Sequence, residues 1–119
     1  GWGGPVEGER PAAYIIILGD TEIAKTVMCD HGIAAQTIML GAVDKGLGGC
    51  IMASVKKDQL RELLAIPARY EVLLSLALGK PKEQVIIEPL GRSGDFKYWR
   101  DAMGVHHVPK RALDDIIIG

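Results

Sequence analysis

The chain has 119 residues and a mass of 12.8 kDa, enough for one domain with a modest core. Its 14 Lys and Arg residues nearly balance 15 Asp and Glu residues, and a net charge of −1 argues against a nucleic-acid or polybasic membrane binder. An apolar fraction of 48% excludes a disordered chain, and no apolar run is long enough to span a bilayer. We therefore expect a single folded domain, residues 1–119, with no nucleic-acid or membrane partner.

The cysteine content and the hydropathy indicate the compartment and the assembly. Cys29 and Cys50 are too few for a disulfide-based scaffold, and we interpret them as reduced thiols in a cytoplasmic protein. Residues 1–11 lack the basic and then apolar pattern of a secretory signal peptide. The mean hydropathy of +0.15 is high for so short a chain and indicates apolar surface that a second subunit would cover.

The first predicted element is a strand at Ala13–Leu18. Its continuous apolar run is typical of a strand covered on both faces. In the polar stretch that follows, Asp20 or Thr21 would cap a short helical turn over residues 22–27.

The longest helical pattern is Asp30–Asp44. Its apolar residues surround the helix axis, which predicts burial on every side and, in so small a domain, a helix at a subunit interface. Ala35 and Gly41 are small enough to let another backbone approach. Large replacements at either position are predicted to dissociate or destabilise a homodimer.

The second half of the chain continues the alternation of strands and helices. Gly46 is interpreted as the glycine that ends the long helix. The elements expected after it are a strand at Cys50–Ala53, a helix at Lys57–Leu64 capped by Ser54, a strand at Tyr70–Leu78, a loop at Pro89–Asp95, at best a helical turn at Phe96–Gly104, an extended basic segment at Val105–Arg111, and a small apolar strand or peg at Asp114–Ile118. Three consecutive isoleucines, residues 116–118, cannot all face one core, so we predict that they pack on the partner subunit. The order of elements predicts an α/β or α+β fold.

The residue pattern offers no evident catalytic or metal site. The glycines at 46, 48 and 49 follow a helix and precede a strand, which is the wrong order for a dinucleotide-binding turn or a P-loop. His106 and His107 are adjacent, so in an extended segment they point to opposite sides and do not share a metal; we interpret them as polar loop residues. No Ser/His/Asp order indicates a catalytic triad.

Two segments remain as candidate binding sites, each with a plain structural alternative. Lys110 and Arg111 follow a proline and could clamp a phosphate, or they could belong to a solvated charged loop. Gly48 and Gly49 lead into a short strand where a flat ligand could rest on main-chain N–H groups, or the whole segment could be a core strand.

Five segments in order resemble the nitroreductase family of FMN-dependent oxidoreductases. They are Arg10-Pro11 before a strand, Asp30–Leu40 with the sequence DHGIAAQTIML, Gly46–Met52 with the sequence GLGGCIM, Leu78–Pro81 with the sequence LGKP, and Val108–Arg111 with the sequence VPKR. The resemblance implies a nitroreductase-like sheet flanked by helices in a homodimer. The Arg-rich N-terminal segment of the family, which holds the FMN phosphate, has no counterpart, so the chain resembles the C-terminal portion of the fold, either as a fragment or as a shortened protein.

The resemblance also implies site residues. Gly49, Ile51, Met52 and Ala53 would lie along the isoalloxazine edge of FMN and offer main-chain N–H groups to the ring, and Lys110 and Arg111 would reach the phosphate. The flavin performs the hydride and electron chemistry, so no catalytic side chain and no metal are expected. We expect this chain alone to hold FMN weakly or not at all, and a version with the family-type N-terminal segment to hold it tightly.

Two functions follow as hypotheses. The first is an FMN-dependent NAD(P)H oxidoreductase that reduces nitroaromatics, quinones or similar acceptors. The alternative is a shortened, non-catalytic dimeric interaction module that has lost flavin binding. Uptake of FMN by the purified protein distinguishes them.

Overall fold

The computed structural model describes residues 4–118, which fall into two compact units, residues 4–81 and residues 82–118. The elements of the first unit are β1 (Ala13–Asp20), α1 (Asp30–Asp44), β2 (Gly48–Met52), α2 (Lys57–Leu63) and β3 (Tyr70–Gly79). Those of the second unit are β4 (Val85–Pro89), β5 (Trp99–Arg100), β6 (His106–Lys110) and the 3-10 turn η1 (Leu113–Asp115).

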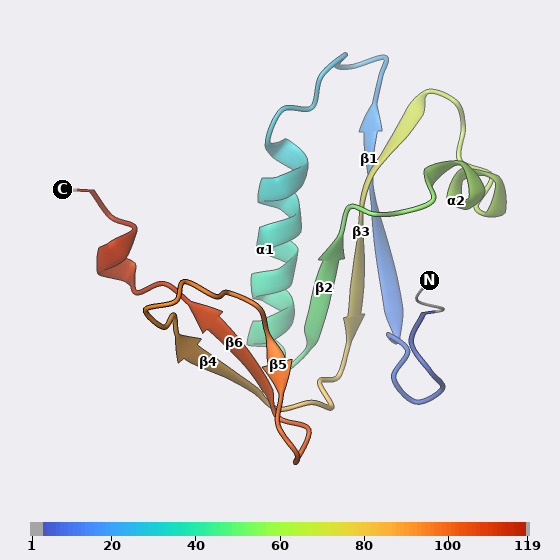
Figure 1. The fold of residues 1–119 in the computed structure, drawn as a ribbon. Helices are drawn as coiled ribbons and strands as arrows, with labels where there is room; N and C mark the ends of the chain where they lie inside the picture. The colour runs from blue at the N-terminus through green and yellow to red at the C-terminus, as the bar shows by residue number, and fades with distance from the viewer. Residues whose placement is uncertain (1–3, 119) are drawn as a thin grey trace. The chain divides into compact units, whose positions relative to one another are not determined.

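The first unit is a three-stranded sheet with α1 along one face (Figure 1). The strand order is β1-β3-β2, and β3 pairs antiparallel with both neighbours. Because β3 lies in the middle, its apolar run is the most buried part of the chain. The predicted strands at 13–18 and 70–78 are confirmed. The strand predicted at 50–53 is also present, but it begins at Gly48 and ends at Met52.

The core lies between α1 and the sheet. Ala35 of α1 and Leu76 of β3 have no exposed surface, and Leu74 is also buried beside them. Ile17 of β1 and Ile38 of α1 pack against this cluster. Alternate residues of a strand point to opposite faces, so the even-numbered leucines of β3 face the helix and hold it in place.

Helix α1 has the predicted bounds, and its burial by a second subunit stays a prediction. Within this chain only one face is buried, and Ile33, Leu40 and Val43 on the other side remain 61–64% exposed. Ala35 faces the chain's own sheet, so a large residue there would disrupt this core and would not report on an interface. Gly41 is exposed, and a side chain added there would meet nothing within 4 Å.

Strand β1 is an edge strand of the described sheet, which corrects the prediction of a strand covered on both faces. Its apolar run still leaves Tyr14 55% exposed. The end of β1 is tied to the start of β3 by an ion pair between Asp20 and Arg69, and Thr21 donates hydrogen bonds from its main-chain N–H and its hydroxyl to the Arg69 carbonyl at 3.0 and 2.7 Å. No helix forms over residues 22–27, where the chain makes a turn closed by an N–H···O bond from Ala24 to Asp20.

The helix ends test two predicted caps. Gly46 has φ +71°, and the N–H of Leu47 bonds back to the Ala42 carbonyl, which is the glycine-terminated helix end that was predicted. The predicted Ser54 cap is wrong, because α2 begins after Lys56 and no side chain caps its N-terminus. A polar side chain caps a helix by accepting a hydrogen bond from a free main-chain N–H group of the first turn, and Ser54 lies too far before α2 to do so.

The second unit contains strands that the sequence did not indicate. Its sheet has the order β4-β6-β5, with β4 parallel and β5 antiparallel to β6. Strand β5 replaces the helical turn predicted at 96–104, and β4 was not expected. The predicted extended segment at 105–111 is confirmed as β6. Of the two alternatives for Asp114–Ile118, the strand is wrong, because η1 occupies Leu113–Asp115 and residues 116–118 form no strand; the apolar peg that packs on a partner stays a prediction.

The described residues therefore form a mixed α and β structure with two sheets and two α-helices. Between residues 4 and 118, none of the helices is both long enough and apolar enough to cross a membrane.

Candidate functional site

The predicted ring-binding segment is the outer edge of the first sheet. Strand β2 pairs with β3 on one side, and among the described residues no strand pairs with its other side. Alternate main-chain N–H groups of such an edge have no partner in the sheet. Gly49, Ile51 and Ala53 are exposed, and Met52 is half-buried. The segment is thus an accessible strand edge, and not the fully covered core strand of the alternative interpretation.

Gly49 has a packing role of its own. A Cβ atom at this position would lie 2.3 Å from the carbonyl oxygen of Ala77, 2.9 Å from Leu78 Cδ2 and 3.0 Å from Met39 Cε. The absence of a side chain lets β2 approach both β3 and α1. Close packing within the chain therefore explains this glycine without reference to a ligand.

The predicted phosphate-binding residues lie at the end of β6. Lys110 is the last residue of the strand, and its carbonyl accepts a hydrogen bond of 2.8 Å from the N–H of Leu90. The side chains of Lys110 and Arg111 are exposed, and within residues 4–118 neither makes an ion pair. Two unpaired cations on an anchored backbone suit an anionic ligand. They belong to the second unit, whereas β2 belongs to the first.

A hollow of about 600 Å³ lies at the N-terminal end of α1 and is open to solvent. It is lined by Met28, Cys29, His31, Gly32, Ile33, Gln36 and Thr37. None of the predicted cofactor-binding residues contributes to it, and its lining carries no Lys or Arg for a phosphate.

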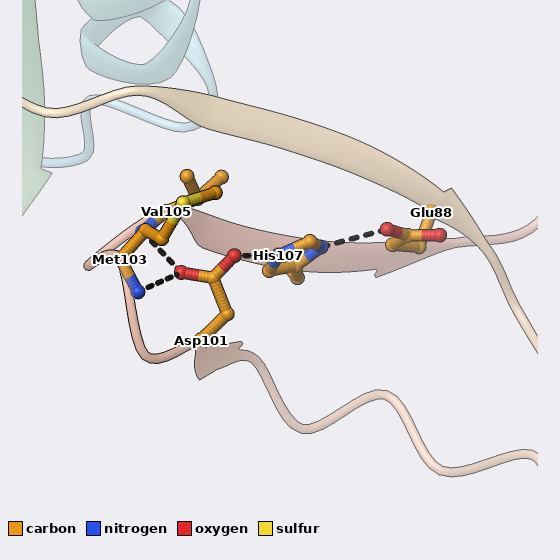
Figure 2. Close-up of polar contacts among 5 residues, drawn as sticks. All are labelled: Glu88, Asp101, Met103, Val105 and His107. Carbon is orange, nitrogen blue, oxygen red and sulfur yellow. Dashed lines mark hydrogen bonds and ion pairs between the residues drawn. The ribbon is translucent and has the colours of Figure 1, made fainter.

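A polar cluster surrounds His107 (Figure 2). The Nδ1 atom of His107 lies 2.7 Å from Glu88 Oε1 of β4, and its Nε2 atom lies 3.5 Å from Asp101 Oδ2, just after β5. The other carboxylate oxygen of Asp101 accepts hydrogen bonds of 2.9 Å from the main-chain N–H groups of Met103 and Val105. Glu88, His107 and the turn that Asp101 organises are thereby joined across three strands.

An aromatic ring covers this histidine. The indole of Trp99 stacks on the imidazole, with ring centroids 3.9 Å apart and planes 4° from parallel. The pairing of Trp99 with His107 in the β5–β6 ladder places both side chains on one face of the sheet. The His107 side chain is only 12% exposed as a result of these contacts.

The carboxylates set the charge states of the cluster. The hydrogen bond to Glu88 raises the pKa of His107 above its usual 6.5, burial opposes this, and Asp101 adds to the increase. The pKa of Asp101 is lowered from its usual value of 3.8, mainly by the hydrogen bond from the Val105 N–H. Both carboxylates therefore stabilise the charged form of the imidazole relative to the neutral form.

A second cluster surrounds the neighbouring histidine. Glu83 accepts a hydrogen bond of 2.7 Å from Arg100 Nη2, and its other oxygen lies 3.4 Å from His106 Nδ1. Arg100 lowers the pKa of Glu83. The ring of Tyr98 meets His106 edge-on, with centroids 5.1 Å apart. The prediction that the two histidines point to opposite sides fits their separate partners, but both are strand residues and not loop residues.

Sequence reasoning missed the His107 cluster because it tested the histidines for metal binding alone. Two signals were available: acidic residues spaced along the apolar segment 83–89, and the turn sequence D-A-M-G-V at 101–105. Within the described part of the chain, no group of three or more His, Cys, Asp or Glu side chains is placed to hold a metal ion. Cys29 and Cys50 are free and exposed.

Comparisons with known proteins identify relatives for the first unit. A model described as the nitroreductase family matches residues 7–80, which include β2 and end before Lys110 and Arg111. The NADPH-flavin oxidoreductase of Vibrio harveyi is 34% identical over 71 residues, covering 58% of this chain and 30% of that protein. The chain thus spans less than a third of this curated relative.

Solved structures resemble part of the chain. An FMN-dependent nitroreductase from Clostridium difficile R20291 has a TM-score of 0.55 and 29% identity, covering 60% of this chain and 46% of its own. A nitroreductase family protein from Clostridium novyi NT has a TM-score of 0.53 and 32% identity, covering 58% and 43%. The NADPH:FMN oxidoreductase from Vibrio harveyi complexed with NAD+ has a TM-score of 0.56, covering 78% and 50%; at 24% identity it is similar in fold alone.

The family match covers more than half of the chain. It includes the first three of the five segments that carried the sequence resemblance and most of the fourth, and it ends before Val108–Arg111. The chain belongs to the nitroreductase family.

Proposed function

We propose that the chain is part of an FMN-dependent NAD(P)H oxidoreductase that reduces nitroaromatics, quinones or similar small acceptors. The observation that carries this proposal is the family match over residues 7–80, which contains the whole of β2. The related Vibrio harveyi protein is an NADPH-flavin oxidoreductase, which supports the same class of reaction. We also propose that residues 1–119 act as one nitroreductase-like domain.

The residues present fit a flavin in two respects. The free edge of β2 offers main-chain N–H groups that are not used by the sheet, and such donors stabilise negative charge on a flavin ring. Gly49, Ile51, Met52 and Ala53 would hold the ring edge. Lys110 and Arg111 are exposed cations that would bind the phosphate.

In this proposal the bound FMN supplies the hydride and electron chemistry. The chain's own residues bind and orient it: the β2 edge fixes the ring through main-chain groups, and the cations of β6 and the residue after it neutralise the phosphate. No side chain of this chain needs to gain or lose a proton for that role.

We further propose a cytoplasmic homodimer in which the exposed face of α1 contacts a second subunit. Ile33, Leu40 and Val43 recur on one side of the helix and are more than 60% exposed. The isoleucines at 116–118 are also exposed, at 55%, 61% and 101%, and would pack on the partner. The two exposed free thiols suit a reducing compartment.

Turnover tests the proposed activity directly. The chain is mixed with FMN, a quinone or nitroaromatic acceptor, and either NADPH or NADH, and the loss of the reduced nicotinamide is followed against FMN without protein. A rate above the protein-free rate supports the proposal. A preparation that takes up no FMN and adds nothing to the free-flavin rate favours the non-catalytic interaction module.

A further inference from the structure

His107 connects all three strands of the second unit. Glu88 comes from β4, His107 from β6, and Asp101 from the turn after β5 (Figure 2). Trp99 belongs to β5 and pairs with His107 in the ladder. In the parallel β4–β6 pair His107 is opposite Ile86, so Glu88, two residues farther on, lies on the same face of the sheet. We name the four residues Glu88, Trp99, Asp101 and His107 the His107 latch.

The number of protons on the imidazole decides how many carboxylates it can bind. An imidazolium donates from both ring nitrogens and satisfies Glu88 and Asp101 together. A neutral imidazole carries one proton, so one carboxylate must then face a nitrogen lone pair. The contact with Glu88 is 2.7 Å and that with Asp101 is 3.5 Å, so the remaining proton stays on the Glu88 side.

We propose that the His107 latch is a pH-dependent switch. When His107 is charged, the latch holds the turn at residues 101–105, after β5, against the β4–β6 pair. When His107 becomes neutral, that turn is released. Strand β5 has only two residues, so few ladder hydrogen bonds hold it against β6 once the contacts of the latch are lost. The turn at 101–105 keeps its internal bonds to Asp101 but loses its charged link to β6. Trp99, stacked on the same imidazole, reports the change.

The charged groups that act on His107 define the pH window. They are Glu88 of β4 and Asp101 after β5; Glu83, Arg100 and His106 form the separate cluster described above. The pKa of His107 is raised, so the latch's contribution is complete below the ordinary value near 6.5 and is lost as pH rises through the folded-state value. The pKa of Asp101 is lowered, so its contribution is present above its ordinary 3.8 and is lost only in stronger acid.

The test follows Trp99 and the turn in the full chain. The chain has two tryptophans, so a Trp2→Phe version leaves Trp99 as the sole indole. A charged imidazole in van der Waals contact quenches indole emission, so emission is recorded between about pH 5 and about pH 9. Amide exchange of Met103 and Val105 is measured over the same range as protection factors, which correct for the base-catalysed intrinsic rate. NMR titration of the three histidines assigns the transition to a residue.

The expected result is an emission increase with a midpoint above about 6.5, coincident with the His107 NMR titration and with a roughly two- to five-fold fall in protection of Met103 and Val105. In Glu88→Gln the midpoint falls, and in His107→Gln the emission no longer depends on pH. His106→Gln, on the same strand with different partners, keeps the parent midpoint.

Three results would overturn the proposal. They are a His107 midpoint at or below about 6.5 in the parent, an emission that titrates with His106, or turn protection that stays constant while His107 titrates. The parent titration alone decides the first and the third. The proposal therefore stays falsifiable even if His107→Gln does not fold.

Discussion

Gly49→Ala tests the packing that brings β2 against β3 and α1. A Cβ atom almost never comes within 3.0 Å of another heavy atom, and here it would lie 2.3 Å from the Ala77 carbonyl oxygen. The nearest obstacle is backbone, so the strands themselves must move apart. Overpacking of this kind costs about 1–3 kcal/mol, and we expect the upper end, which lowers Tm by about 10–20 °C.

Gly41→Ala is the matched control, because a Cβ there meets nothing within 4 Å and the residue lies inside a helix. It should raise the stability by about 0.5–1 kcal/mol, since alanine favours helix over glycine. Both variants are compared with the parent by thermal and urea unfolding followed by circular dichroism. A Gly49→Ala protein as stable as the parent would refute the close approach of β2 and β3.

Two further substitutions test the first unit. Asp20→Asn removes the ion pair with Arg69, whose hydrogen bond lowers the pKa of Asp20 from its usual 3.8. The loss of stability should therefore be present at neutral pH and should shrink as pH falls below 3.8 and the parent carboxyl takes up its proton; an equal loss at neutral pH and in acid, measured by urea unfolding, would contradict this. Leu40→Glu changes a 61% exposed residue of α1, so the unfolding free energy of the dissociated monomer should change by less than about 0.5 kcal/mol, while sedimentation shows a weaker dimer. A parent that sediments as a monomer would exclude the proposed interface.

The parts of the fold that hydrophobic pattern determines were predictable. Helix α1 was predicted with its correct bounds because no proline interrupts it and Gly46 ends it with a positive φ. Strand β3 was equally clear, since a long apolar run in a small domain belongs at the centre of a sheet. The covering of β1 was overestimated, because a pattern shows which residues are apolar but not whether the same chain covers them. For α1 the same pattern predicts a second subunit on the exposed face, and this stays a prediction.

The second unit was less predictable because its strands are short and depend on partners distant in sequence. Strand β5 has only two residues and forms because it pairs with β6, so no local sequence pattern predicts it. The contacts of His107 with Glu88 and Asp101 require the register of both neighbouring strands. The candidate flavin residues came from family resemblance, and the exposed edge of β2 is what the structure adds to that prediction.

The central claim is that this chain contributes part of an FMN site, weak on its own, in which Lys110 and Arg111 recognise the phosphate. Flavin fluorescence quenching is titrated with FMN and with riboflavin, which lacks the phosphate, for the parent and for the variant with both Lys110→Ala and Arg111→Ala. A variant with Arg92→Ala and Lys97→Ala removes the same charge from two other exposed cations of the second unit and serves as the control.

We predict weak binding in which the parent and the control prefer FMN to riboflavin by about 10- to 100-fold, while the Lys110/Arg111 variant binds the two flavins equally. Equal affinity of the parent for both flavins, or submicromolar FMN binding that survives the double substitution, would contradict the account.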